Sequence, residues 1–149
     1  MLTVIEKVIF LQNVDVFDKV PTEQLAYLAA IAEEIDYKAD TNIYRENDAS
    51  DALYLVLDGR VRLHRDGREI AVAAEKEAFG TWALFDDEPR LSAATAQVDT
   101  RLLCIDRDDF IELLADHVEI TQGVLKTMVG RLRGLVGRVG TGPNARPAE

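Results

Sequence analysis

Residues 53–61 decide the fold class, and they read Leu53-Tyr54-Leu55-Val56-Leu57-Asp58-Gly59-Arg60-Val61. Five consecutive apolar or aromatic residues that end at a turn signal are typical of a buried β-strand. Asp-Gly is a strong turn signal. Val61 and Leu63 then alternate with Arg62 and His64, which predicts a second strand after the turn.

Further short strands are predicted on both sides of this stretch. The alternating or apolar segments are 35–37 and 42–44 before it, and 69–73, 93–98 and 101–105 after it. Asp66-Gly67 predicts another hairpin turn. Many short strands at close intervals favour an antiparallel β-roll or a jelly-roll-like barrel.

Helices are predicted at both ends of the strand region. Apolar residues at helical spacing indicate helices at about 3–11 and 22–34, and an acidic first turn at Asp106–Asp109 predicts a third. A long helix follows at 118–139. We therefore expect an α+β domain over 1–139, with a roll at about 35–106, C-terminal helices at about 107–139 and a flexible Gly/Pro-rich tail at 140–149.

Composition narrows the functional classes. The 149 residues fit one domain, and a net charge of −10 opposes binding to duplex DNA. The one cysteine, Cys104, lies in an apolar run and is expected to be buried. A single cysteine cannot form a disulfide within the chain, which suits a reducing cytoplasm. We find no signal-peptide layout, membrane span or metal-ligand spacing, and no catalytic motif, so an enzyme is not expected.

The segment 79–90 carries the chemistry: Phe-Gly-Thr-Trp-Ala-Leu-Phe-Asp-Asp-Glu-Pro-Arg. A glycine after a strand, followed by a short helical turn, leaves N–H groups that can hold an anion. Arg90, directed by Pro89, can fork onto two phosphate oxygens. Gly80 and Arg90 thus predict a phosphate cradle. The carboxylates at 86–88 would repel an anion unless they point to solvent.

These motifs resemble the cyclic nucleotide-binding domain family over residues 11–135. The resemblance rests on Phe17, on residues 53–61, on Phe79-Gly80 with Ala83-Leu84, and on Pro89-Arg90. It implies a β-roll in which Gly80 approaches a cyclic nucleotide, such as cAMP or cGMP, with its backbone and Arg90 binds the phosphate.

Three positions depart from the family pattern. Thr81 stands where a Glu usually accepts the ribose 2′-hydroxyl, Leu91 stands where a small residue is usual, and Lys76 replaces a Gly. Losing an ionised acceptor for a buried hydroxyl costs about 1.5–3 kcal/mol. The alternative is a pocket that holds another small anion, or none. The candidate ligand-binding residues are Phe79, Gly80, Thr81, Trp82, Ala83, Arg90, Leu91 and Ser92.

The sequence allows two interpretations of Trp82. It could stack on a base, as aromatic residues do in nucleotide sites. A tryptophan in a short helix is more often packed into the domain, and we favour that interpretation from the sequence.

The last helix carries a heptad seam. Thr121, Leu125, Met128, Leu132, Leu135 and Val139 follow the 4-3-4-3-4 spacing of a and d positions. The seam could dock on the roll or form a homodimer. The cations of this helix are either a solvated face or a docking site for an acidic partner or a membrane.

Two hypotheses follow, a regulatory module whose ligand shifts the C-terminal helices and a ligand-free interaction or dimerisation domain of a larger signalling or membrane protein. Family members that bind DNA carry a helix-turn-helix after the long helix. We expect none here and no direct DNA binding.

Overall fold

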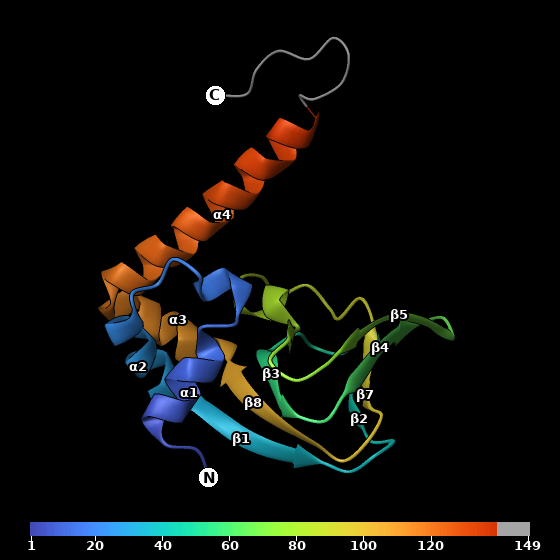
Figure 1. The fold of residues 1–149 in the computed structure, drawn as a ribbon. Coiled ribbons are helices and arrows are strands. Elements are labelled where there is room, and N and C mark those ends of the chain that lie inside the picture. The colour runs from blue at the N-terminus through green and yellow to red at the C-terminus, as the bar shows by residue number, and fades with distance from the viewer. Residues whose placement is uncertain (140–149) are drawn as a thin grey trace.

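The computed structural model describes residues 1–139 and shows a β-roll with helices packed at one side (Figure 1). The helices are α1 (Val4–Leu11), η1 (Asp15–Phe17), α2 (Thr22–Ile31), η2 (Thr81–Leu84), α3 (Arg107–Asp116) and α4 (Val118–Val139). The strands are β1 (Ala32–Tyr37), β2 (Asn42–Tyr44), β3 (Ala52–Asp58), β4 (Val61–Arg65), β5 (Arg68–Ala73), β6 (Ala78–Phe79), β7 (Ala93–Ala96) and β8 (Thr100–Asp106). The predicted α+β class is confirmed, while the predicted tail at 140–149 lies outside the described residues.

The strands form two four-stranded antiparallel sheets. The first has the order β1-β8-β3-β6 and the second β2-β7-β4-β5, and the two do not close into a barrel. The turn at Asp66-Gly67 joins the paired strands β4 and β5, as predicted. The turn at Asp58-Gly59 instead carries the chain from the first sheet to the second, since β3 and β4 do not pair.

Strand β3 is buried on both faces, which explains its unbroken apolar sequence. Successive side chains of a strand point to opposite faces. Leu53, Leu55 and Leu57 therefore pack against the helices, in a cluster that also contains Phe17. Val56, on the alternate face, packs with residues of the second sheet. The roll thus has one core beneath the helices and another between its sheets.

The helix starts follow from their capping residues. Thr3 and Glu6 form a reciprocal capping box at α1. Asp106 accepts hydrogen bonds from the backbone N–H groups of Asp108 and Asp109 at 2.8 and 3.3 Å, which confirms the acidic helix start. No helix among residues 1–139 combines the length and the apolar character needed to cross a membrane.

Two sequence predictions about local structure were wrong. Helix α2 ends at Ile31 rather than near residue 34, because Ala32 is already extended and pairs with Ile105 of β8. Strand pairing here overrides the local helical pattern. Cys104 on β8 is half-buried rather than fully buried.

Lys76 adopts a left-handed backbone conformation with φ of 72°. This conformation costs a non-glycine residue about 1–2 kcal/mol, whereas glycine adopts it freely at the cost of extra chain entropy. We expect Lys76→Gly to stabilise the fold by about 0.5–1 kcal/mol, measured by urea unfolding. The neighbouring exposed Glu75 has no positive φ, so Glu75→Gly is the matched control and should not stabilise. Equal effects would contradict this account.

Burial raises the pKa of the Cys104 thiol to about 11, and the carboxylates of Asp106, Asp51 and Glu33 add to the rise. Because the thiolate is the reactive form, alkylation at pH 8 should be about 100-fold slower than for an unshifted thiol. Iodoacetamide rates measured against pH, in native buffer and in urea, test this. If the alkylation rate of the folded protein rose with pH at the same midpoint as that of the unfolded chain, the raised pKa of Cys104 would be contradicted.

Candidate functional site

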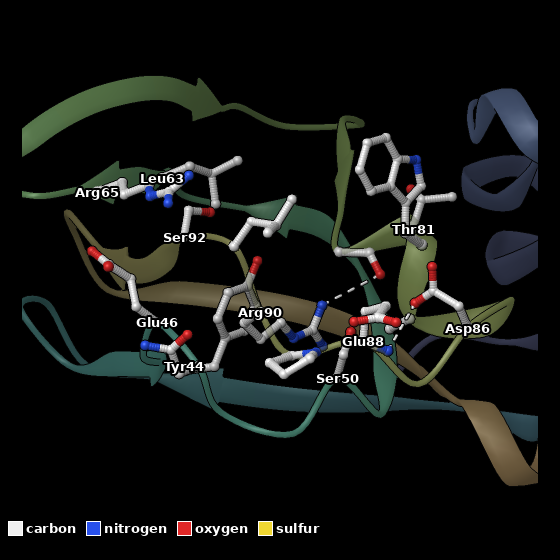
Figure 2. Close-up of a pocket in the computed structure, with 16 residues that line it drawn as sticks. Tyr44, Glu46, Ser50, Leu63, Arg65, Thr81, Asp86, Glu88, Arg90 and Ser92 are labelled. Atoms are coloured by element: carbon white, nitrogen blue, oxygen red, sulfur yellow. Dashed lines mark hydrogen bonds between the residues drawn. The ribbon is translucent and has the colours of Figure 1, made fainter.

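A cavity of about 660 Å³ opens where the two sheets meet the segment between β6 and β7 (Figure 2). Its walls come from β2 and the loop after it, from β4, and from residues 80–92. Seven of the eight predicted ligand-binding residues line it: Gly80, Thr81, Trp82, Ala83, Arg90, Leu91 and Ser92. The fold therefore brings most of the predicted set to one hollow.

Gly80 makes the turn that begins this wall. Its φ of 73° is left-handed, and the chain then enters the single 3₁₀ turn η2. Ala83 and Leu84 of η2 are buried, and Phe85 meets Phe110 of α3 edge to face, with the ring centroids 5.7 Å apart. The short turn is thus held between the cavity and the helices.

Arg90 is the chemical centre of the cavity wall, and its side chain is only 6% exposed. Nη2 donates to the carbonyl oxygen of Ala52 at 2.7 Å, and Nη1 donates to that of Gly80 at 3.4 Å. The guanidinium carbon lies 4.1 Å from the ring centroid of Tyr44, a cation–π contact. Nε has no hydrogen-bond partner among the described residues.

The backbone of Arg90 is equally constrained. Its N–H donates to the carbonyl oxygen of Asp48, and its carbonyl oxygen accepts from the N–H of Asn47, both at 2.9 Å. These bonds tie the end of the segment to the loop after β2. Hydrogen bonds of the Arg90 backbone therefore fix where the side chain begins, and backbone carbonyl oxygens hold the guanidinium at its far end.

The charge of Arg90 has no carboxylate partner within residues 1–139. The ion pairs of this part of the chain involve other residues, although Asp86, Asp87 and Glu88 are close in sequence. Burial raises the pKa values of Tyr44 and Tyr54, and the positive charge of Arg90 opposes both rises. A buried charge without a counter-ion is costly, so an anion in the cavity would be favourable.

Two predicted residues are placed differently from expectation. Phe79 does not line the cavity, because its ring is buried and stacks on Tyr54 with a centroid distance of 5.2 Å. The favoured interpretation of Trp82 as packed into the domain was wrong, since Trp82 is 67% exposed at the cavity wall. Ala83 and Leu84 fill the inner side of η2 and leave Trp82 outside.

Sequence reasoning missed the opposite wall, formed by Tyr44, Glu46, Asn47, Ser50, Leu63 and Arg65. The turn-forming residues 47–51 and the alternation along β4 were visible, but neither pattern shows what the side chains face. The wall forms only because β2 and β4 both pair with β7.

The predicted seam on α4 is mostly unburied. Leu125, Leu132 and Leu135 are exposed, and Met128 is half-buried against the helical core. The Val139 side chain lies outside the described part of the structure. Homodimerisation through this seam stays a prediction.

The family model of the cyclic nucleotide-binding domain matches residues 34–117, more than half of the chain. The chain belongs to this family. The match includes both sheets beyond the first residues of β1, the whole segment 79–90 and α3. The cavity around Gly80 and Arg90 thus lies inside the matched region of a cyclic nucleotide-binding domain.

Several family members are similar to this domain. The CRP-like cAMP-activated global transcriptional regulator of Mycobacterium tuberculosis is 30% identical over 83% of this chain and 57% of its own length. The cAMP-dependent protein kinase regulatory subunit of Aspergillus niger is 33% identical over 74% of this chain and 28% of its own. The crystal structure of the N-terminal domain of a transcriptional regulator from Streptomyces coelicolor A3(2) superposes with a TM-score of 0.76, at 33% identity over 81% of this chain and 90% of that one.

The three departures from the family pattern have distinct structural settings. Lys76 keeps the left-handed conformation that a glycine would adopt. Leu91 is 61% exposed, and both Leu91 and Thr81 line the cavity. Lys76 thus has a backbone conformation that glycine adopts freely, while Thr81 and Leu91 both lie at the cavity.

Gly80→Ala should destabilise the domain more than the same change at Gly67. A Cβ at Gly80 would lie 2.6 Å from Nη1 of Arg90 and 3.2 Å from the Ala52 carbonyl oxygen, so the guanidinium would have to shift and strain its hydrogen bond to Ala52. Gly67 has φ of 76°, but a Cβ at that position would have open space around it, with no contact within 4 Å. We expect about 1–2 kcal/mol for Gly67→Ala and a further 1–3 kcal/mol, roughly, for Gly80→Ala. Urea unfolding measures both, and equal losses would contradict the contact.

Proposed function

We propose that this domain is a non-enzymatic regulatory module whose cavity binds a cyclic nucleotide through Arg90. One observation carries the proposal: Arg90 lies at the cavity wall as a buried guanidinium that has no carboxylate partner among residues 1–139. Its Nε has no protein acceptor in that part of the chain. A ligand phosphate would supply a counter-charge, and it would offer an acceptor to Nη1, whose bond to Gly80 is long.

The neighbouring groups would share the binding. The N–H groups at the start of η2 follow Gly80, and the Arg90 guanidinium occupies the space that a side chain at Gly80 would fill, so both kinds of donor lie close together. The hydrogen bond from Nη1 to Gly80 is long, at 3.4 Å, so it can be exchanged for a phosphate oxygen at little cost. The Arg90 guanidinium thus has N–H donors that a phosphate could accept from, and it lies at the wall of the cavity where the phosphate would bind.

The other residues that line the cavity should make the binding of a cyclic nucleotide weak. Thr81 offers a neutral hydroxyl where the family pattern has a carboxylate for the ribose. Glu46, Asp86 and Glu88 also line the cavity and add negative charge. Replacing a charged hydrogen bond by a neutral one lowers affinity by roughly 10- to 150-fold. We therefore propose an affinity well below that of a site with a complete ribose contact.

A route from the cavity to the helices supports a regulatory role. The Arg107 side chain of α3 donates to the backbone carbonyl oxygen of Asp86 at 2.7 Å and to that of Ser50 at 3.2 Å. Phe85 and Phe110 pack across the same boundary. A ligand that moves the segment 79–90 would thereby bias α3 and α4, a shift between helix arrangements.

The second candidate is an interaction domain that works without a ligand, alone or within a larger signalling or membrane protein. The observation that favours it is the exposed apolar surface of α4. A half-buried free cysteine fits the cytoplasm in either case. We do not assign DNA contact to this domain, because its net charge of −10 opposes phosphate backbones.

Isothermal titration calorimetry with cAMP and cGMP tests the ligand. We expect binding by the unmodified protein and a loss of about 10-fold or more in Arg90→Gln, because charged hydrogen bonds to the phosphate disappear. Arg101→Gln is the matched control, since Arg101 pairs with Asp36 away from the cavity. Circular dichroism confirms that each variant is folded.

Thr81→Glu keeps the test informative if Arg90→Gln does not fold. Restoring a carboxylate should strengthen binding of cAMP or cGMP by about 10-fold, while the 2′-deoxy nucleotide should gain nothing. No heat and no thermal shift with either nucleotide at millimolar concentration, for the unmodified protein and for Thr81→Glu, would overturn the nucleotide proposal.

A further inference from the structure

Helix α4 uses one face to pack against its own domain. Ile120 and Val124 are fully or almost fully buried there, and Thr127 is buried one turn further on. Gly123 lies against the backbone of Lys19 and Val20, where an added Cβ would meet atoms at 2.7–2.9 Å. Beyond this contact α4 extends away from the roll, so its C-terminal half projects from the body (Figure 1).

A different face of the projecting helix is apolar and exposed. Its members are Leu125 (57% exposed), Val129 (48%), Leu132 (61%), Leu135 (51%) and Val136 (60%). At 100° per residue they fall within a sector of about 120°, whose centre lies about 80° from Val124 and about 120° from Ile120, with Leu135 at the edge next to Val124. We call this set the α4 stripe. Met128 lies within the same sector and packs against the helical core, so the domain covers one edge of this surface and leaves the five side chains of the stripe exposed.

Cations flank the α4 stripe on both sides. Lys126 and Arg133 lie on one side and Arg131 on the other, and all three are exposed. Arg131 forms an ion pair with Asp15 of η1, in which Nη2 lies 3.6 Å from Oδ2. The only acidic residue of α4 is Glu119, in its first turn, although the whole chain has a net charge of −10. The stripe is thus a basic, apolar surface on an acidic protein.

We propose that the α4 stripe is a docking site for an α-helix from another protein, one with an apolar heptad seam flanked by glutamates or aspartates. The exposed Leu125, Val129, Leu132 and Val136 follow a 4-3-4 spacing, which is the pattern that pairs one helix with another. Residues beside such a seam set partner choice by their charge. Acidic flanks on the partner would complement Lys126, Arg131 and Arg133.

A second copy of the chain fits this surface less well. Paired helices lie 8–10 Å apart, about one Debye length at physiological salt. Two α4 helices would bring the same cations together along the stripe, with no carboxylate between residues 120 and 139 to pair with them. An acidic foreign helix removes this repulsion.

A lipid surface also fits less well. It requires an apolar face but no heptad spacing. An anionic bilayer is an extended plane, so it would approach more of the acidic body of the domain than a single helix lying along α4 would. The spacing and the charge distribution together favour a helical partner.

The probe is a synthetic four-heptad peptide with Ile at a, Leu at d and Glu at e and g, labelled for fluorescence anisotropy. A matched peptide carries Lys at e and g. We expect the Glu peptide to bind at least 10-fold more tightly, to gain helix on binding, and to weaken as salt rises. Equal binding of the two peptides, or no binding of either, would overturn the proposal.

Two variants locate the contact. Leu132→Glu should abolish binding of the Glu peptide, whereas Ile9→Glu, at an equally exposed apolar residue of α1, should leave it unchanged. Reversal of Arg131 and Arg133 to Glu should transfer the preference to the Lys peptide. Failure of this transfer would overturn the charge argument.

Sedimentation velocity and vesicle flotation separate the other occupants. A dimer of the unmodified chain that Leu132→Glu dissociates would overturn the proposal in favour of a second copy. Leu132-dependent binding to phosphatidylserine-containing vesicles would overturn it in favour of a membrane. Both measurements are independent of whether a nucleotide binds at Arg90.

Discussion

The guanidinium of Arg90 is held beneath Gly80 by the carbonyl oxygen of Ala52 and the ring of Tyr44, and the geometry of the site depends on this contact. It joins the segment 79–90 to β3 of the first sheet and to β2 of the second. Because carbonyl dipoles and an aromatic face offset its charge only partly, the cation is stable when buried but still favours an anion. Gly80 is needed for the same reason, since any side chain there would meet Nη1.

The two-sided burial of β3 links this cavity to the helices. The face of β3 that carries Tyr54 looks toward Arg90, and the face that carries Leu53 and Leu55 supports the helical core. Phe85 packs edge to face against Phe110 of α3, and the Arg107 side chain donates a hydrogen bond to the backbone carbonyl oxygen of Asp86. A large shift of the segment 79–90, which carries Arg90, would therefore disturb the contacts that position α3. This coupling is physical contact between packed elements, and it requires no separate relay.

The strands, the helix caps and most of one cavity wall could be predicted because each is a local pattern. Asp106 caps the helix that directly follows it, and the cavity-lining residues between Gly80 and Ser92 are close together in sequence. Tyr44 and Arg65 were missed because they reach the cavity through strand pairing, which the local pattern does not contain. Trp82 was misplaced for a related reason. The short turn η2 has only enough neighbours to bury Ala83 and Leu84, so the larger side chain stays outside.

Helix α4 shows how one sequence pattern can divide into two surfaces. The heptad spacing predicted a single seam, but the domain buries Ile120, Val124 and Thr127 from a different face and leaves Leu125 and Leu132 exposed. Gly123 allows that inner face to approach the Lys19–Val20 backbone closely, which fixes the rotation of the helix. Once this rotation is set, the outer residues cannot be satisfied within the domain. An apolar stripe with cations on both flanks is costly to leave in water, and a partner helix with acidic flanks removes that cost most completely.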